Sequence, residues 1–309
     1  MELELVRWLH ERLPPHPKLA LGIGDDAAIL RLAQGAGAVV TVDLLTDGVD
    51  FELSQVGPAR VGRKALAVNL SDLAAMAAQP VGAVIALALP RNDGLRVAQL
   101  LYEGLLPLAG QFDVAIAGGD TNSWDGRLVV SVTLVGELTP AGPLVRSGAK
   151  SGDAIVVTGQ FGGSILGHHL DFEPRVRESI WLKGHYPLHA GIDTSDGLSL
   201  DLWRLAESSG CGAVINLDAV PIAPASHQLA SQRADGSTPL DHALGDGEDF
   251  ELILAMPQAA ARELVAAQPL GCPCKCIGQF VSERGLWQTE PNQPRRPLVP
   301  RGFEHSFNP

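Results

Sequence analysis

The segment from Pro58 to Ala78 restricts the possible folds of this chain more than any other feature. Ala, Leu and Met dominate it, and its length and composition are typical of a helix that is buried on most sides. Such a helix needs a large apolar partner. The run Val81–Leu89, which ends at Pro90, has the composition of a buried strand. The two segments together predict a helix packed on a sheet.

The rest of the chain alternates between strand and helix patterns. Further strands are predicted at Ala38–Val42, Val114–Ala117, Leu128–Val135, Ala154–Thr158, Ala213–Leu217 and Phe250–Ala255, and helices at Leu3–Leu13, Arg96–Ala109 and Ser199–Ser209. The span Pro221–Ala243 reads as loop with a short helix. The fold class is therefore mixed α/β. The breaker-rich stretch Thr139–Pro143 predicts a boundary between domains at residues 1–140 and 141–309.

Charge and composition exclude several classes of protein. The 309 residues carry a formal charge of −12, which argues against binding to nucleic acid. No apolar run approaches the ~20 residues that span a bilayer, and no secretory leader is recognisable at the N-terminus. A cytoplasmic protein without a membrane partner is expected. Cys272, Cys274 and Cys276 are spaced too closely for a usual zinc site, so reduced thiols on a strand are favoured over a metal clip.

Aspartates recur beside glycines or at the ends of apolar segments. The five segments of this kind are Gly22–Ala28, Val42–Leu44, Asn69–Leu73, Gly118–Thr121 and Ile192–Gly197. Glycine lets a phosphate approach main-chain N–H groups, and aspartate supplies the hard oxygen ligands that Mg²⁺ prefers beside substrate phosphates. Each motif alone is also typical of a simple turn. Their combination favours a magnesium-dependent enzyme of phosphoryl transfer that uses ATP.

Asp72 is the most informative of these acids. It interrupts an otherwise apolar helix, where a charge is costly unless it is paired or bound to metal. Asn69, one turn earlier, shares its face. The alternative is that Asp72 caps the start of a helix. The sequence has no phosphate loop of the Gly-x4-Gly-Lys type, no protein-kinase signature and no nucleophile elbow.

Seven blocks resemble the thiamine-monophosphate kinase family, which belongs to the superfamily of aminoimidazole ribonucleotide synthetase. They occur in the family's order at Gly22–Ala28, Lys64–Met76, Ala117–Thr121, Arg146–Lys150, Ile192–Leu198, Gly247–Leu252 and Arg301–His305. The resemblance implies a two-domain fold of that superfamily, with a metal- and ATP-binding N-terminal domain, a C-terminal domain that completes an active site in the cleft between them, and a homodimer formed through N-terminal strands.

The resemblance also implies the reaction and the residues. Thiamine monophosphate would receive the γ-phosphoryl group of ATP, giving thiamine diphosphate, with Mg²⁺ as cofactor. Positions matching metal ligands are Asp26, Thr41, Val42, Asp43, Asp72, Asp120, Asp193 and Asp196, of which Asp72, Asp120 and Asp196 are the catalytic candidates. Positions matching nucleotide contacts are Tyr102, Gly119, Asp120, Arg146 and Ser195, and those matching substrate contacts are Asp50, Glu248 and Phe303.

The chain departs from the family pattern at several places. Asp50 stands where the family often has a histidine that touches substrate, Val42 replaces a hydroxyl residue before Asp43, and Asp246 replaces a glycine before Gly247. The block Asp171–Arg175 replaces an Arg-Pro-rich stretch. Asp50 would repel a phosphate unless metal intervenes, and the alternative is that it faces the cationic thiazolium.

The chemistry agrees with the resemblance because the phosphate nucleophile is already an anion. Charge neutralisation and in-line positioning are needed rather than a strong base, so no catalytic histidine and no covalent intermediate are expected. Two alternatives remain open. One is another ATP-dependent enzyme of the superfamily, such as aminoimidazole ribonucleotide synthetase, and the other is a homologue that binds nucleotide or thiamine phosphate without turnover.

Overall fold

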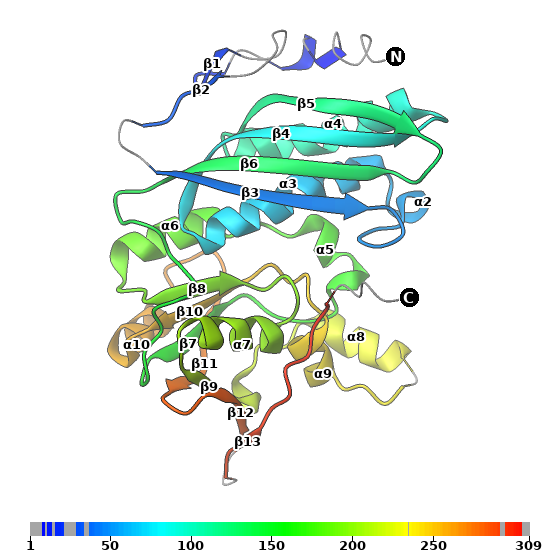
Figure 1. Cartoon of the computed structure of the whole chain (residues 1–309). Coiled ribbons are helices and arrows are strands. Elements are labelled where there is room, and N and C mark those ends of the chain that lie inside the picture. Colours follow the sequence, from blue (N-terminus) through cyan, green and yellow to red (C-terminus); the bar gives the residue numbers. More distant parts are fainter. Residues whose placement is uncertain are drawn as a thin grey trace. The chain divides into compact units, whose positions relative to one another are not determined.

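A computed structural model describes residues 8–9, 11–13, 16–21, 29–33, 37–233, 235–290 and 294–304 (Figure 1). It divides into two compact units. Unit 1 comprises Met1–Leu73 and Ala78–Pro140, and unit 2 comprises Ala74–Ala77 and Ala141–Pro309. The predicted helix Leu3–Leu13 lies partly, and the motif Gly22–Ala28 wholly, outside the described residues.

A four-stranded sheet forms the frame of unit 1, in the order β3-β6-β4-β5. Its strands are β3 (Ala38–Thr46), β6 (Val129–Leu138), β4 (Ala78–Pro90) and β5 (Ala115–Trp124). A separate pair joins β1 (Leu19–Leu21) to β2 (Ile29–Leu30). The connection from β4 to its parallel neighbour β5 runs through helix α4 (Gly94–Gln111), as parallel strands require.

Helices α3 (Pro58–Ala75) and α4 lie on the same side of this sheet (Figure 1). Leu66, Leu70 and Leu73 of α3 are completely buried. Val132 and Leu134 on β6 are at most 1% exposed. The predicted buried helix on a sheet is therefore confirmed. A short helix α2 (Leu53–Val56) precedes α3. The opposite face of the sheet carries exposed apolar side chains, because successive residues of a strand point to opposite faces.

Unit 2 is built on a seven-stranded sheet in the order β13-β12-β9-β11-β7-β10-β8. Its strands are β7 (Ala154–Thr158), β8 (Ala190–Asp193), β9 (Gly212–Asn216), β10 (Leu252–Met256), β11 (Cys274–Val281), β12 (Gly285–Thr289) and β13 (Arg296–Pro297). The α-helices are α5 (His168–Asp171), α6 (Val176–His185), α7 (Leu198–Ser208), α8 (Pro224–Gln232), α9 (Pro239–Gly245) and α10 (Gln258–Ala267). The short 3-10 helices η1 (Ser164–Leu166) and η2 (Leu217–Ala219) complete it.

The core of unit 2 lies between the sheet and α7. Ile155 and Val157 of β7, Ile253 of β10, and Leu202 and Leu205 of α7 are all inaccessible to solvent. The predicted mixed α/β class is confirmed. No described helix is long and apolar enough to cross a membrane.

The three clustered cysteines lie at the start of β11. Cys272, Cys274 and Cys276 are all free thiols, and the first two are buried. Burial raises the pKa of Cys272 to about 11 and that of Cys274 to about 12, which keeps both protonated at neutral pH. Cys272 and Cys274 therefore pack as small apolar groups, while Cys276 is only partly buried.

Candidate functional site

Three acidic side chains of unit 1 come together beside β3. Asp43 lies on β3 and Asp72 near the end of α3, and Thr41 donates a hydrogen bond from its hydroxyl to Asp72 Oδ2. Thr41 and Asp43 share one face of the strand because they are two residues apart. Asp50 follows in the turn after β3. These residues were predicted as metal or substrate ligands, and the fold brings them to one place.

The carboxyl group of Asp43 has a strongly raised pKa. Burial, followed by repulsion from Asp72 and then from Asp50, raises its pKa from an ordinary 3.8 to about 7. Its Oδ2 is buried and has no hydrogen-bond partner among the residues that the structure describes. A buried carboxylate oxygen without a partner, beside further carboxylates, is unfavourable unless a cation joins them. The donor set of carboxylate and hydroxyl oxygens therefore fits Mg²⁺, with phosphate and water oxygens completing its shell.

The position of Asp72 decides between the two interpretations of that residue. Helix α3 begins at Pro58, so Asp72 lies in its C-terminal half and cannot be an N-cap. The capping alternative is wrong. Asn69, on the same face, is completely buried and donates to the carbonyl of Ala65 at 3.0 Å, while its Oδ1 is buried and has no partner in the described part of the chain. Polar oxygens thus extend along this face of an otherwise apolar helix.

Asp50 and Val42, two of the departures from the family pattern, have clear local environments. Asp50 Oδ2 accepts the backbone N–H of Thr46 at 2.7 Å, which closes the turn after β3, and its carbonyl accepts Lys64 Nζ at 2.8 Å. The Val42 side chain is 61% exposed and points to the face opposite Asp43. The hydroxyl beside Asp43 comes instead from Thr41.

Asp120 and Gly119 lie on β5, at the far edge of the sheet from β3. Strand β5 is three strands away from β3, and at the usual spacing between neighbouring strands the two lie about 14 Å apart. One Mg²⁺, with ligands at ~2.1 Å, cannot bind both Asp43 and Asp120. Gly119 leaves no room for a side chain, since a Cβ there would lie 1.9 Å from the carbonyl oxygen of Ile85.

Three further predicted residues have different surroundings. Tyr102 is buried in α4, and burial raises its pKa to about 12. Its ring centroid lies 6.4 Å from that of Trp8. Tyr102 therefore packs in the core, whether or not it also contacts nucleotide. Arg146 of unit 2 is exposed, and its carbonyl accepts a hydrogen bond from Ser209. Asp26 lies outside the described residues.

The second acidic motif connects β8 to α7 in unit 2. Asp193 is buried at the end of β8, and Asp196 lies two residues before α7. The buried carboxylate of Asp201 accepts the backbone N–H groups of Asp196 at 2.9 Å and Gly197 at 3.0 Å. Arg204 contacts the carboxylates of both Asp196 and Asp201. These contacts fix the loop and place the Arg204 guanidinium beside the Asp196 carboxylate.

The loop Asp246–Glu251 lies against this acidic motif. The N–H of Glu248 donates to Ser195 O at 2.7 Å, and the N–H of Phe303 donates to Asp196 O at 2.9 Å. Glu248 adopts a left-handed φ of +54°, an unusual backbone for a residue with a side chain. Backbone hydrogen bonds therefore bring four predicted residues together: Ser195, Asp196, Glu248 and Phe303.

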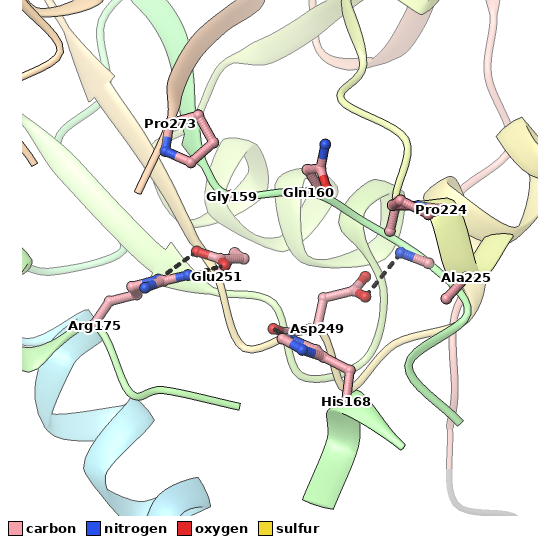
Figure 2. A pocket seen from close by; sticks show the side chains of 11 residues that line it. Gly159, Gln160, His168, Arg175, Pro224, Ala225, Asp249, Glu251 and Pro273 are labelled. Carbon is pink, nitrogen blue, oxygen red and sulfur yellow. Dashed lines mark hydrogen bonds and ion pairs between the residues drawn. The ribbon is translucent and has the colours of Figure 1, made fainter. Parts of the chain in front are cut away.

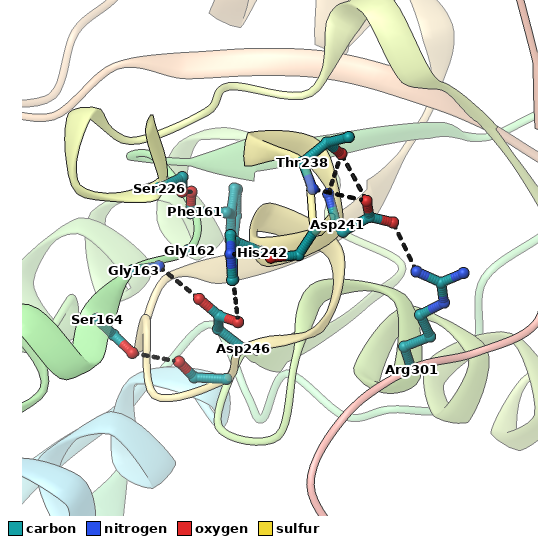
Figure 3. A network of polar contacts seen from close by, with 12 residues as sticks. Phe161, Gly162, Gly163, Ser164, Ser226, Thr238, Asp241, His242, Asp246 and Arg301 are labelled. Atoms are coloured by element: carbon teal, nitrogen blue, oxygen red, sulfur yellow. Dashed lines mark hydrogen bonds and ion pairs between the residues drawn. The ribbon is translucent and has the colours of Figure 1, made fainter. Parts of the chain in front are cut away.

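A network of polar contacts holds the glycine loop after β7 to the loop after α9 (Figure 3). Asp246 accepts the N–H of Gly163 at 2.8 Å and contacts His242 at 2.8 Å, and Ser164 donates to the carbonyl of Gly247 at 2.6 Å. Asp246, the third departure from the family pattern, thus joins the two loops through its side chain.

The same two loops border a cavity of about 360 Å³ within unit 2 (Figure 2). It is lined by Gly159, Gln160, Gly162, His168, Arg175, Ala223, Pro224, Ala225, Asp249, Glu251 and Pro273. Glu251 is buried and binds Arg175 through both of its carboxylate oxygens. The predicted site contains none of these residues.

The residues that sequence reasoning missed share one property, which is that their partners are distant in sequence. Arg175 and Glu251 are an example, as are Lys64 and the carbonyl of Asp50. A signal existed for two of them. Lys64 is a charge inside an apolar helix, and Asp201 lies four residues after Gly197 on the first turn of a helix that follows an acidic motif.

Comparisons with known proteins agree with this architecture. Residues 24–138 match the family model of the AIR synthase related protein N-terminal domain, and residues 150–286 match that of its C-terminal domain. The thiamine-monophosphate kinase of Rhodopirellula baltica is 42% identical over 99% of this chain and 97% of its own length.

Two solved structures extend the likeness to three dimensions. The thiamine-monophosphate kinase of Stenotrophomonas maltophilia has a TM-score of 0.79 and 32% identity over 93% of this chain and 95% of that chain. The structure of AaThiL complexed with AMPPCP and TMP has a TM-score of 0.77 and 25% identity over 99% and 96%. The chain belongs to the thiamine-monophosphate kinase family of AIR synthase related proteins.

Proposed function

We propose that this protein transfers the γ-phosphoryl group of ATP directly to thiamine monophosphate, giving thiamine diphosphate and ADP. Near-full-length identity of 42% to a thiamine-monophosphate kinase supports the reaction, and a relative that binds AMPPCP and TMP supports the two substrates. The observation that carries the proposal in this chain is the Thr41, Asp43 and Asp72 cluster with its orphaned buried oxygen.

The cluster is suited to hold Mg²⁺, which when bound would neutralise the charge on the reacting phosphates. Asp43 and Asp72 supply carboxylate oxygens, and the Thr41 hydroxyl orients Asp72 by donating to one of its oxygens. Asp120, at the other edge of the sheet, would bind a separate ion. In unit 2 we assign metal contacts to Asp193 and Asp196, on the loop that Asp201 fixes.

The remaining predicted contacts keep their assignments as proposals. Ser195, Gly119, Arg146 and Tyr102 are assigned to the nucleotide, and Glu248 and Phe303 to the thiamine moiety. Of these, Glu248 and Phe303 are supported by their shared backbone contacts to the Ser195–Asp196 segment. Asp50 is assigned to substrate binding with the least support, because its Oδ2 already closes a turn.

We also propose that the chain forms a homodimer through the uncovered face of the unit 1 sheet. Val40, Val42 and Leu44 are each more than 60% exposed on one face of β3, and Val84 of β4 is 42% exposed. An apolar patch of this kind on a sheet is typical of an interface between subunits.

A substrate panel tests the proposed function. The protein is incubated with ATP, Mg²⁺ and either thiamine monophosphate, thiamine or formylglycinamidine ribonucleotide, and the products are separated by chromatography. We expect thiamine diphosphate and an equal amount of ADP from the first mixture alone. Turnover of formylglycinamidine ribonucleotide would favour the other superfamily activity, and tight binding of thiamine monophosphate without product would identify a non-catalytic homologue.

A further inference from the structure

Arg204 on helix α7 is shared by two carboxylates of the second acidic motif. Its Nη1 donates to Asp196 Oδ2, and the same nitrogen lies 2.9 Å from Asp201 Oδ1. Arg204 and Asp201 are three residues apart on α7, so they lie on one face of the helix. One guanidinium nitrogen thus serves both acids, and Asp196 is one of the proposed metal ligands.

Asp201 holds Arg204 independently of Asp196. The Asp201 side chain is only 1% exposed, and its Oδ2 accepts the backbone N–H groups of Asp196 at 2.9 Å and Gly197 at 3.0 Å. Its Oδ1 accepts the arginine. A buried carboxylate is costly without a cation, so Asp201 keeps the guanidinium in place. Arg204 therefore stays beside the motif even when its contact with Asp196 is broken.

The loop that carries Asp196 does not need Arg204 to keep its shape. Ser195 O accepts the N–H of Glu248 at 2.7 Å, and Asp196 O accepts the N–H of Phe303 at 2.9 Å. The loop is therefore tied by its backbone to the loop after α9 and to the C-terminal segment, as well as to Asp201. What Arg204 adds at the Asp196 carboxylate is mainly positive charge.

That charge competes with a metal ion. A carboxylate oxygen that accepts a guanidinium N–H is less available to Mg²⁺, and the nearby positive charge repels a divalent cation. The Asp196 and Arg204 side chains are 31% and 29% exposed, so water screens this repulsion only in part. The unit 1 cluster differs, because Asp43 Oδ2 is buried with no hydrogen-bond partner in the described ranges.

We propose that Arg204 is the counter-ion of Asp196 in the metal-free protein and that this contact keeps divalent cations from the motif until nucleotide phosphates arrive. The inference rests on the proposed function, which assigns a metal contact to Asp196. Phosphate oxygens bring the negative charge that Arg204 cancels, and they share a bound Mg²⁺ with aspartate. The unit 1 cluster should therefore bind metal first, and the unit 2 motif only together with nucleotide.

Mn²⁺ titrations of the nucleotide-free protein test the competition directly. Mn²⁺ replaces Mg²⁺ because it accepts the same oxygen ligands, and its free concentration is read by electron paramagnetic resonance. Arg204→Gln removes the charge but keeps an amide donor for Asp201. We expect this variant to bind a further Mn²⁺ about tenfold more tightly than wild type, and the gain to vanish in Arg204→Gln/Asp196→Asn. If Arg204 only shaped the loop, its loss would weaken binding instead.

A second variant tests the proposal without changing Arg204. Asp196 is partly exposed, so Asp196→Asn leaves the core of unit 2 filled. Without nucleotide this substitution should alter Mn²⁺ binding by less than about twofold, because Arg204 already neutralises the carboxylate that it removes. With the β,γ-methylene analogue of ATP present, the same substitution should weaken Mn²⁺ binding about tenfold, because a ligand is then lost.

Arg296→Met is the matched control. It removes one positive charge from an exposed ion pair with Glu290 in the same unit, and it should leave both titrations unchanged. The inference is overturned if Arg204→Gln binds Mn²⁺ no more tightly than wild type, or if Asp196→Asn weakens binding equally with and without nucleotide. Either result leaves the proposed kinase reaction intact, because these titrations involve no turnover. Absence of turnover in the substrate panel would in turn leave the nucleotide-free competition unchanged.

Discussion

The Asp43→Asn substitution should stabilise the magnesium-free protein at alkaline pH. The folded protein raises the Asp43 pKa from an ordinary 3.8 to about 7. Between these values the unfolded chain loses the proton while the folded protein keeps it, so the stability that this group contributes is complete below pH 3.8 and is lost as pH rises through about 7. The shift corresponds to an upper bound of about 4 kcal/mol, and partial exposure reduces this to roughly 2–4 kcal/mol.

The assay is urea unfolding in the presence of a chelator, followed by hydrogen exchange of peptides from β3 and α3. Local exchange is chosen because two units need not unfold in one step. At pH 8 the variant should unfold at higher urea than wild type, while at pH 4 the two should coincide. Adding Mg²⁺ at a hundred times its Kd should stabilise wild type by about 2.7 kcal/mol and the variant far less.

A matched control is Asp125→Asn. The Asp125 side chain is 85% exposed in the same unit, and its removal should not change the pH dependence. The reasoning is refuted if Asp43→Asn is no more stable than wild type at pH 8. It is also refuted if Mg²⁺ stabilises the two proteins equally.

Three further predictions concern catalysis, assembly and folding. Asp72→Asn should lower kcat at least about 100-fold while the magnesium-free protein stays folded, since it removes a proposed metal ligand without changing core volume, and near-normal turnover would exclude that role. Leu44→Asp should convert the proposed homodimer to a monomer in sedimentation experiments, because it places a charge in an apolar interface, whereas an unchanged sedimentation coefficient would argue for another interface. Arg175→Met should lower the free energy of unfolding by about 3–5 kcal/mol, because it leaves the buried Glu251 carboxylate without its cation, and the added substitution Glu251→Gln should recover most of the loss. Urea unfolding of the single and double variants checks this, and equal losses in both would contradict it.

The sequence predicted the parts of the fold that apolar periodicity controls. Strand β7 begins and ends at the predicted residues, and the apolar segment before β4 forms a buried helix. Helix α3 nevertheless ends at Ala75, because Ala77 takes a left-handed φ of +51° that no helix can continue through. Helix α6 escaped prediction because its composition is mixed and shows little periodicity. Helix α10 was also missed, although its residues are mostly Ala, Arg, Glu and Leu, which favour a helix.

The candidate site was predictable only where an acid breaks a local pattern. Asp72 stands out in an apolar helix, and Asp193 and Asp196 stand out beside glycine. Asp249 gives no comparable signal, since its environment is created by Gly162, which lies 87 positions away in the sequence. The orphaned oxygens of Asp43 and Asp249 depend on burial, which tertiary packing alone determines.

Direct transfer between the two substrates is the central claim, and the stereochemistry at phosphorus tests it most directly. The protein is given ATP with a chiral, isotopically labelled γ-thiophosphoryl group together with thiamine monophosphate and Mg²⁺, and the configuration of the transferred group is determined by NMR. A single in-line displacement predicts inversion, because the acceptor phosphate attacks opposite the leaving ADP. Retention of configuration would require a phosphorylated protein intermediate and would contradict the account.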